Sequence, residues 1–173
     1  MSESRPSAEL ARAVRDRALG CCEYCLSQAR YAPDPFSVEH IVPRSRGGAT
    51  EAANLALSCQ GCNNRKYTAV EAIDPVTGDP VPLFHPRLHS WAVHFAWTED
   101  YTLILGLTPT GRATVEKLDL NRSGLVNLRR ILAAAAAHPP SAPHLIVVEN
   151  RAWPHRNLRV ATRQLQTRQA LPA

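Results

Sequence analysis

The hydrophobic positions at the start of the chain recur at helical spacing. Leu10, Val14 and Ala18 are four residues apart, and Ser7 before them is a residue type that caps helix N-termini. Gly20 follows the last of these positions and is typical of a helix end. The pattern predicts an N-terminal helix within residues 1–20.

The next segment, residues 21–73, is rich in Cys, His and Asn and has no long apolar run. Its alternating stretches predict two strands, at residues 36–41 and 55–58, with a glycine-containing loop at 46–48 between them. A helix is predicted after the second strand, at residues 61–70. A segment of this composition has little apolar material for a core. We therefore expect another kind of link to hold these short elements together.

A turn or linker is predicted next, at residues 74–83. The sequence IDPVTGDPVP in this region is dense in Pro, Gly and Asp. Beyond it, apolar residues alternate from Trp91 to Trp97 and extend again over residues 102–107. The break between them, Thr98-Glu99-Asp100, suits a turn, so the pattern predicts two strands of a hairpin.

Helices are predicted for the rest of the second half, around residues 114–118 and over 123–137. Ser123 is the expected cap of the second helix, and Pro139-Pro140 ends it. Residues 84–140 should thus form a hairpin and helical scaffold that packs on the preceding segment. Residues 141–173 form a basic tail, with arginines at 151, 156, 159, 163 and 168.

Composition narrows the class of protein. The chain has 173 residues and a formal charge of +5, which suits a polyanionic partner such as nucleic acid. No apolar run approaches the roughly 20 residues that cross a bilayer, and the N-terminus lacks the pattern of a signal peptide. We therefore expect a cytoplasmic protein, in which the five cysteines stay reduced and favour metal over disulfides.

Two cysteine pairs carry the first chemical signal. Cys22-Glu-Tyr-Cys25 and Cys59-Gln-Gly-Cys62 each place two thiols across a tight turn, and four thiolates match the closed tetrahedral shell of structural Zn²⁺. Redox dithiols and simply buried cysteines are the alternatives, but neither pair follows the βαβ pattern of a redox motif. Cys21 is an alternative ligand to Cys22, and Cys22 is preferred because it completes the spacing.

The residues between and after these pairs resemble the HNH endonuclease motif. That motif has an acidic residue or His before a catalytic His, a Gly-Gly loop, a central Asn before a short strand, and a final His or Asn on a helix. The sequence FSVEHIVPRSRGGATEAANLALSCQGCNNRK supplies these positions as Glu39, His40, Gly47-Gly48, Asn54 and Asn63. The resemblance, over residues 20–70, is to an H-N-N variant found in small standalone bacterial proteins with two cysteine knuckles.

The resemblance implies both a fold and a chemistry. The fold is α+β, with a ββα-metal nuclease core at residues 21–73 stapled by a four-cysteine structural zinc and followed by a C-terminal β-hairpin plus helices. In the implied reaction His40 activates water, Asn54 helps to orient its ring, and Glu39 and Asn63 hold a catalytic Mg²⁺ or Mn²⁺ through hard oxygen atoms. In a regular strand Glu39 and His40 point to opposite faces, so a bend near Pro43 would have to bring them together.

The implied substrate is DNA, most simply double-stranded. Four basic residues surround the motif and could contact phosphates, although ordinary solvated charge is the alternative for each of them. They are Arg44, Arg46, Arg65 and Lys66. A single active site cuts one strand at a time, so a double-strand break would need a homodimer or two sequential nicks.

Other readings of these residues remain open at this stage. A lone Asn is often a turn residue, and Asn63 could be a helix cap. His85, His89 and His94 lack partners at ligand spacing and are expected in packing or at the surface. The competing function is a non-catalytic zinc-containing nucleic-acid-binding module, and a redox protein is a weaker third possibility.

Overall fold

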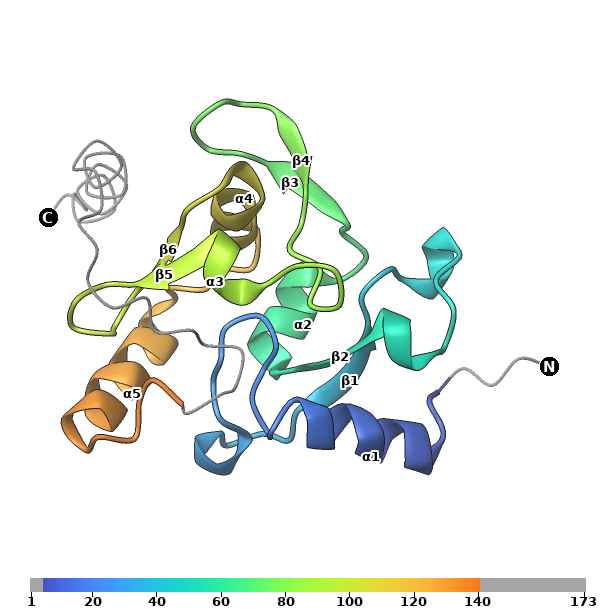
Figure 1. Ribbon diagram of the computed structural model, residues 1–173, viewed down its shortest axis with the longest axis horizontal. Helices are drawn as coiled ribbons and strands as arrows, with labels where there is room; N and C mark the ends of the chain where they lie inside the picture. Colours follow the sequence, from blue (N-terminus) through green and yellow to red (C-terminus); the bar gives the residue numbers. More distant parts are fainter. Residues whose placement is uncertain (1–4, 141–173) are drawn as a thin grey trace, which may run out of the picture.

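The computed structural model describes residues 5–140, so the predicted basic tail lies outside the described residues. Within residues 5–140 the fold is α+β, with three two-stranded antiparallel sheets. The strands are β1 (Ser37–His40), β2 (Leu55–Ser58), β3 (Glu71–Ile73), β4 (Pro80–Pro82), β5 (Phe95–Trp97) and β6 (Ile104–Gly106). The α-helices are α1 (Ala8–Arg17), α2 (Gln60–Lys66), α3 (Trp91–His94), α4 (Pro109–Lys117) and α5 (Ser123–Ala134). Figure 1 shows α1, β1 and β2 on one side of the molecule and β5, β6 and α5 on the other.

Helix α1 forms as the hydrophobic spacing predicts. The Ser7 hydroxyl accepts a hydrogen bond from the Leu10 backbone N–H and caps the helix, while Val14 and Ala18 are buried. The Arg17 guanidinium donates to the backbone carbonyls of Ala52 and Leu55. The arginine therefore fastens α1 to the start of β2.

The β1–β2 hairpin and α2 form the predicted ββα unit. His40 pairs with Leu55 in an antiparallel register, and all four residues of β2 are buried. Helix α2 ends at Lys66, earlier than the predicted residue 70, because Tyr67 takes a positive φ of 48° that breaks the helix. The short helix keeps Lys66 inside the protein.

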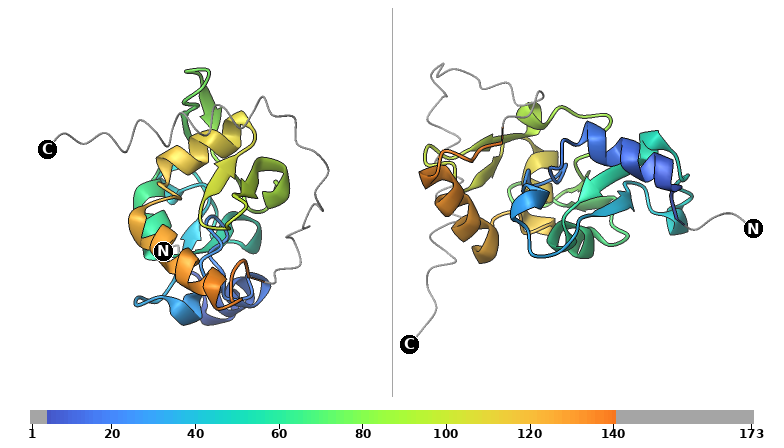
Figure 2. Two further views of the ribbon diagram at one scale, coloured as in Figure 1. Left: turned by 90° about the vertical axis from the view of Figure 1, so that its left-hand side faces the viewer. Right: turned by 90° about the horizontal axis from the view of Figure 1, so that it is seen from below.

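The predicted turn or linker after this unit is the tip of a hairpin. Strands β3 and β4 pair with Ile73 opposite Pro80, and the hairpin projects from the body in Figures 1 and 2. Asp74 in its turn is fully buried and forms a two-pronged ion pair with Arg112 of α4, with N···O distances of 2.8 and 2.6 Å. The Asp74–Arg112 ion pair thus attaches the β3–β4 hairpin to the second half of the chain. A free linker would lack such a contact.

The predicted strand from Trp91 to Trp97 is wrong in its first half. Residues Trp91–His94 form the single turn of α3, and the strand begins only at Phe95. Trp91 and Phe95 are both buried and stack with ring centroids 5.2 Å apart, whereas Val93 is exposed. Apolar residues four positions apart fit one turn of helix as well as they fit alternation, so this pattern was ambiguous.

Helix α5 begins at residue 123 as predicted, but its cap and its C-terminal end differ from the prediction. Arg122, and not Ser123, is the N-cap residue, and its side chain makes no capping hydrogen bond. The helix ends at Ala134 rather than at residue 137, and Ala136 has a positive φ of 54°. The chain therefore leaves the helix before the two prolines.

One hydrophobic core joins the two halves of the described chain. It includes Leu57 of β2 as well as Phe84, Trp91 and Leu118 from the second half. The indole N–H of Trp91 also donates to the backbone carbonyl of Tyr24. The second half of the described chain therefore packs against the β1–β2–α2 unit. Within residues 5–140, no helix has the length and apolar character to cross a membrane.

Candidate active site and metal centre

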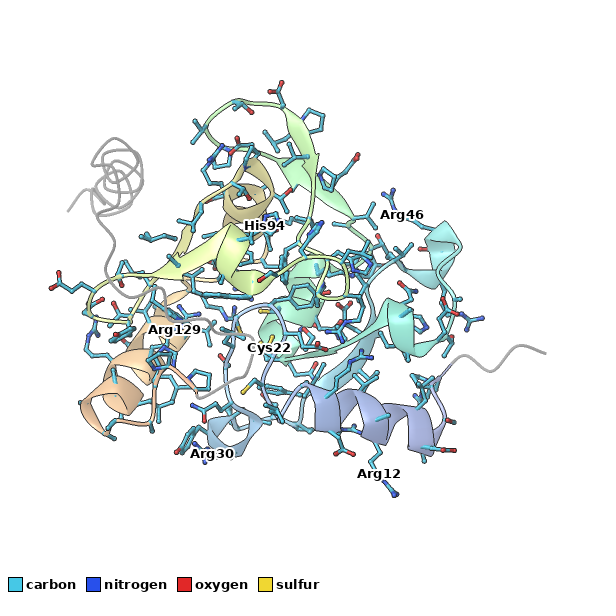
Figure 3. The ribbon with its side chains drawn as sticks, in the orientation of Figure 1. Arg12, Cys22, Arg30, Arg46, His94 and Arg129 are labelled. Atoms are coloured by element: carbon cyan, nitrogen blue, oxygen red, sulfur yellow. The ribbon has the colours of Figure 1, made fainter. Side chains whose placement is uncertain are left out.

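The four cysteines of the two pairs meet in one place. The sulfur atoms of Cys22, Cys25, Cys59 and Cys62 all lie within 4.8 Å of one another, and all four residues are buried. The Cys25 and Cys59 sulfurs are 3.7 Å apart, close to the edge of about 3.8 Å in a tetrahedron with Zn–S bonds of about 2.3 Å. Figure 3 shows Cys22 near the middle of the molecule. The cluster fits a structural zinc ion held by four thiolates.

The geometry also decides between the alternatives for the cysteines. Two independent redox dithiols would not need to share one cluster, so the convergence of both pairs favours metal. The Cys21 thiol is excluded from the group and contacts the backbone carbonyl of Leu19 at 3.7 Å. Cys22 is thus the member that completes the set, as the spacing predicted.

His40 occupies the last position of β1, where the strand gives way to the glycine loop. Its Nε2 atom lies 2.9 Å from the hydroxyl oxygen of Thr50. Burial, followed by the nearby charges of Arg44 and Lys66, lowers the pKa of His40 below its ordinary value of 6.5. The ring is therefore neutral at pH 7, the state that can accept a proton.

Asn54 does not contact the His40 ring, contrary to the role expected for it. Its amide oxygen accepts from the Val42 N–H at 2.8 Å, and its amide nitrogen donates to the carbonyls of Val42 and Ala49, each at 2.9 Å. Asn54 therefore closes the loop between β1 and β2. Asn54 thus holds the backbone on both sides of the loop: its own carbonyl accepts from the Ile41 N–H, next to His40, and its side chain bonds Ala49, next to Thr50.

The Gly47-Gly48 pair is required by this loop. Gly47 has a positive φ of 83°, a backbone conformation that residues other than glycine rarely adopt. A Cβ atom at Gly48 would lie 1.8 Å from the Val42 carbonyl oxygen and 2.7 Å from the Asn54 amide nitrogen. The second glycine thus leaves room for the Asn54 bridge.

Glu39 faces away from His40 and into the protein. Its carboxylate accepts hydrogen bonds from the Tyr24 hydroxyl and, at 2.9 Å, from the Lys66 ammonium, which also donates to the His40 carbonyl at 3.0 Å. The side chains of Glu39 and Lys66 are only 7% and 2% exposed. Burial raises the pKa of Glu39, and Lys66 and Tyr24 partly offset that rise.

The predicted cation site at Glu39 and Asn63 is therefore not assembled in this structure. No bend brings Glu39 to the face of His40, and the Lys66 ammonium already neutralises the carboxylate. Asn63 lies within α2 and is not its N-cap, a position that Cys59 takes. Among residues 5–140, no group of three or more His, Cys, Asp or Glu side chains other than the cysteines could hold a metal ion. These residues do not fit a divalent cation as they stand.

The predicted phosphate-contacting residues separate into three kinds. Lys66 is buried against Glu39 and cannot contact DNA, so its prediction is wrong. Arg65 forms a partly exposed ion pair with Asp119 at 3.4 Å. Arg44 and Arg46 are exposed on a 3₁₀ turn just after β1, and Figure 3 shows Arg46 at the edge of the molecule. Of the four residues, Arg44 and Arg46 are thus the two that are both exposed and close to His40 in the chain.

The three histidines of the second half gather around Phe84. The ring of His89 lies 4.7 Å from that of His94 and 6.4 Å from that of His85, and the Nδ1 atoms of His85 and His89 accept backbone hydrogen bonds. They are packing residues, as expected.

Sequence reasoning missed the residues that hold the active-site segment in place. Thr50 and Tyr24 had no motif position, and Lys66 was assigned to DNA. Tyr24 sits inside the first cysteine pair, so its hydrogen bond to Glu39 links the metal centre directly to β1. The position of Tyr24 between two cysteines of a predicted metal site was the one signal in the sequence.

Comparison with known proteins agrees with the geometry over this segment. Residues 22–69 match the family model described as HNH endonuclease. Neither a search of curated proteins nor a search of solved structures returned a match. The matched segment begins at Cys22 and extends beyond Lys66, so it contains both cysteine pairs and the β1–β2–α2 unit.

Proposed function

Because residues 22–69 form an HNH endonuclease domain, we propose that this protein is an endonuclease that hydrolyses phosphodiester bonds of DNA. The observation that carries the proposal is the His40 ring: its pKa is lowered, and Thr50 holds one of its two nitrogens. A general base must be neutral and oriented before it can act. His40 meets both conditions at the end of β1.

In the proposed reaction, Nδ1 of His40 takes a proton from water. For this, Nε2 must carry the ring hydrogen and donate it to the Thr50 hydroxyl, which can accept it. The water oxygen then bonds to phosphorus as the bond to the leaving sugar oxygen breaks, and that oxygen takes up a proton from the solvent. Lys66 fixes the His40 backbone through its carbonyl, so ring and strand are held from two sides.

Double-stranded DNA is the proposed substrate. Arg44 and Arg46 lie on the exposed turn that follows His40 and would contact phosphates next to the bond that is cut. Binding through such contacts weakens as salt concentration rises, because neutralised phosphates release counterions. Each chain carries one His40, so the expected product of a single encounter is a nick.

The test is cleavage of supercoiled plasmid by wild type and by His40→Ala. The assay is run with Mg²⁺, with Mn²⁺ and with excess chelator, because the family resemblance implies a divalent cation while Glu39 is held by Lys66. We expect nicked plasmid from wild type and a loss of at least 100-fold for His40→Ala, in line with about 10²- to 10⁴-fold for general-base catalysis. Zinc content and circular dichroism must match between the two proteins. Equal cleavage by both would remove His40 from the mechanism.

The second candidate is a non-catalytic zinc-containing module that binds nucleic acid. The buried Glu39–Lys66 ion pair favours it, since it closes the position that the motif reserves for a cation. Such a module would retain plasmid in a salt-sensitive mobility shift but would cut no DNA under any of the three metal conditions. The same samples thus separate the two functions.

A further inference from the structure

The thiolate cluster receives two hydrogen bonds from outside residues 22–69. Arg122, just before α5, directs its Nη2 to the Cys59 sulfur at 3.3 Å and its Nη1 to the Cys62 sulfur at 3.8 Å. The Nη1 atom also donates to the Asp119 carbonyl at 3.2 Å, and this bond fixes the orientation of the guanidinium. One arginine therefore contacts both sulfurs of the second cysteine pair.

Gly61, between those two cysteines, makes this approach sterically feasible. A Cβ atom there would lie 2.4 Å from Nη2 of Arg122 and 2.7 Å from its Cζ. The guanidinium thus lies against the bare backbone of the knuckle. The Arg122 guanidinium can lie in this position because residue 61 has no side chain.

A second arginine of α5 approaches the other cysteine pair. Arg129 is 2% exposed and donates to the backbone carbonyl of Cys25 at 3.4 Å and to that of Thr102 at 3.2 Å. Its guanidinium also lies over the Trp97 ring, 5.0 Å from the centroid. A buried cation at this place needs a buried negative charge near it.

The negative charge of the metal centre is the buried charge that Arg129 requires. Four thiolates around one Zn²⁺ leave two negative charges in excess, and all four cysteines are buried. Two guanidinium groups match two excess charges.

We propose that Arg122, with Arg129 in support, is an outer-sphere residue of the zinc centre, and that α5 is needed to retain the metal. The N–H···S hydrogen bonds withdraw charge from the Cys59 and Cys62 sulfurs and offset the cost of burying the thiolate cluster. The zinc centre thus depends on residues more than fifty positions beyond the second cysteine pair in the chain.

The experiment measures zinc release from the purified full chain to a chromogenic chelator in excess. Wild type is compared with Arg122→Ala, with Arg122→Lys, and with Arg130→Ala as the matched control. Arg130 is on the same helix, exposed, and bonded only to Asn127 at 3.1 Å. We expect release about 10- to 100-fold faster for Arg122→Ala, an intermediate rate for Arg122→Lys, and the wild-type rate for Arg130→Ala.

Cobalt substitution provides a readout that a general loss of stability would not change. Loss of N–H···S bonds raises the energy of the sulfur lone pairs, so the sulfur-to-cobalt charge-transfer band should move to longer wavelength in both Arg122 variants and stay in place for Arg130→Ala. Should Arg122→Ala fail to fold, the comparison of Arg122→Lys with wild type decides. Wild-type release together with an unshifted band in a folded Arg122 variant would overturn the proposal, whatever the nuclease assay shows.

Discussion

The Nε2 atom of His40 lies 2.9 Å from the Thr50 hydroxyl, which sits on the far side of the glycine loop. The hydroxyl can orient the ring, a role that the family resemblance would give to Asn54. His40 thus depends on a residue ten positions later in the chain, and the loop between them has to keep its shape.

Replacing Thr50 by Val should reduce kcat with little effect on KM. Val keeps the shape of Thr but removes the hydroxyl that bonds Nε2, so the His40 ring loses the contact that orients it. We expect a loss of about tenfold or more, equivalent to about 1.4 kcal/mol in the barrier. Steady-state cleavage of a labelled duplex measures it. Thr50→Ser keeps the hydroxyl and should retain most of the rate; equal losses in both variants would contradict the assignment.

The acid limb of the pH–rate profile should report His40. The base acts only when neutral, so activity rises with pH through its pKa, which lies below 6.5 because of burial and of Arg44 and Lys66. Arg44→Gln removes one of these charges, raises the pKa of His40, and should move the limb in kcat/KM to higher pH.

Arg46→Gln is the matched control for that experiment. It removes a neighbouring surface charge that is not among the causes of the shifted His40 pKa. It should weaken DNA binding and leave the acid limb where it is in wild type. Identical limbs in wild type and Arg44→Gln would show that the limb belongs to another group.

Asn54→Ala should destabilise the fold rather than act on the chemistry alone. It leaves the carbonyls of Val42 and Ala49 without their amide donor, at a cost of roughly 1–3 kcal/mol. Asn54→Asp should cost more, because a carboxylate oxygen would face both carbonyls. Urea denaturation measures the change, with exposed Asn64→Ala on α2 as the control. An unchanged midpoint for Asn54→Ala would refute the bridging role.

The Glu39–Lys66 pair should behave as a unit. Lys66→Met leaves a buried carboxylate without its cation, and breaking such a pair costs about 3–5 kcal/mol. The double variant Glu39→Gln/Lys66→Met removes both charges and should recover much of that loss. The free energies of unfolding of the two single variants and the double variant form a thermodynamic cycle. Additive losses would mean that the two side chains do not interact.

Local patterns in the sequence predicted the four-cysteine cluster and the β1–β2 hairpin well. The x-x spacing of each cysteine pair constrains two sulfurs directly, and strand β2 was predicted with its observed bounds. These features depend on neighbours in the chain. Patterns of this kind need no knowledge of the rest of the fold.

The predictions that failed depended on packing between distant segments. Lys66 looked like a phosphate contact because its burial is set by the position of Glu39 on another element. Arg122 had no motif, since its partners are sulfurs sixty and sixty-three positions earlier. Trp91 was placed in a strand because a spacing of four apolar positions fits two kinds of backbone. Tertiary contacts decided each case.

The three two-stranded sheets found within residues 5–140 have a consequence for how the protein opens. A lone two-stranded hairpin is marginally stable in water, and here the β1–β2 and β5–β6 sheets rely on a core shared by Leu57 and Phe95. Neither of these two sheets can then unfold while the other remains, whereas the projecting β3–β4 hairpin has no buried strand residue. Amide hydrogens of β2 and of α5 should therefore exchange with deuterium at similar rates, through a single global opening of the molecule.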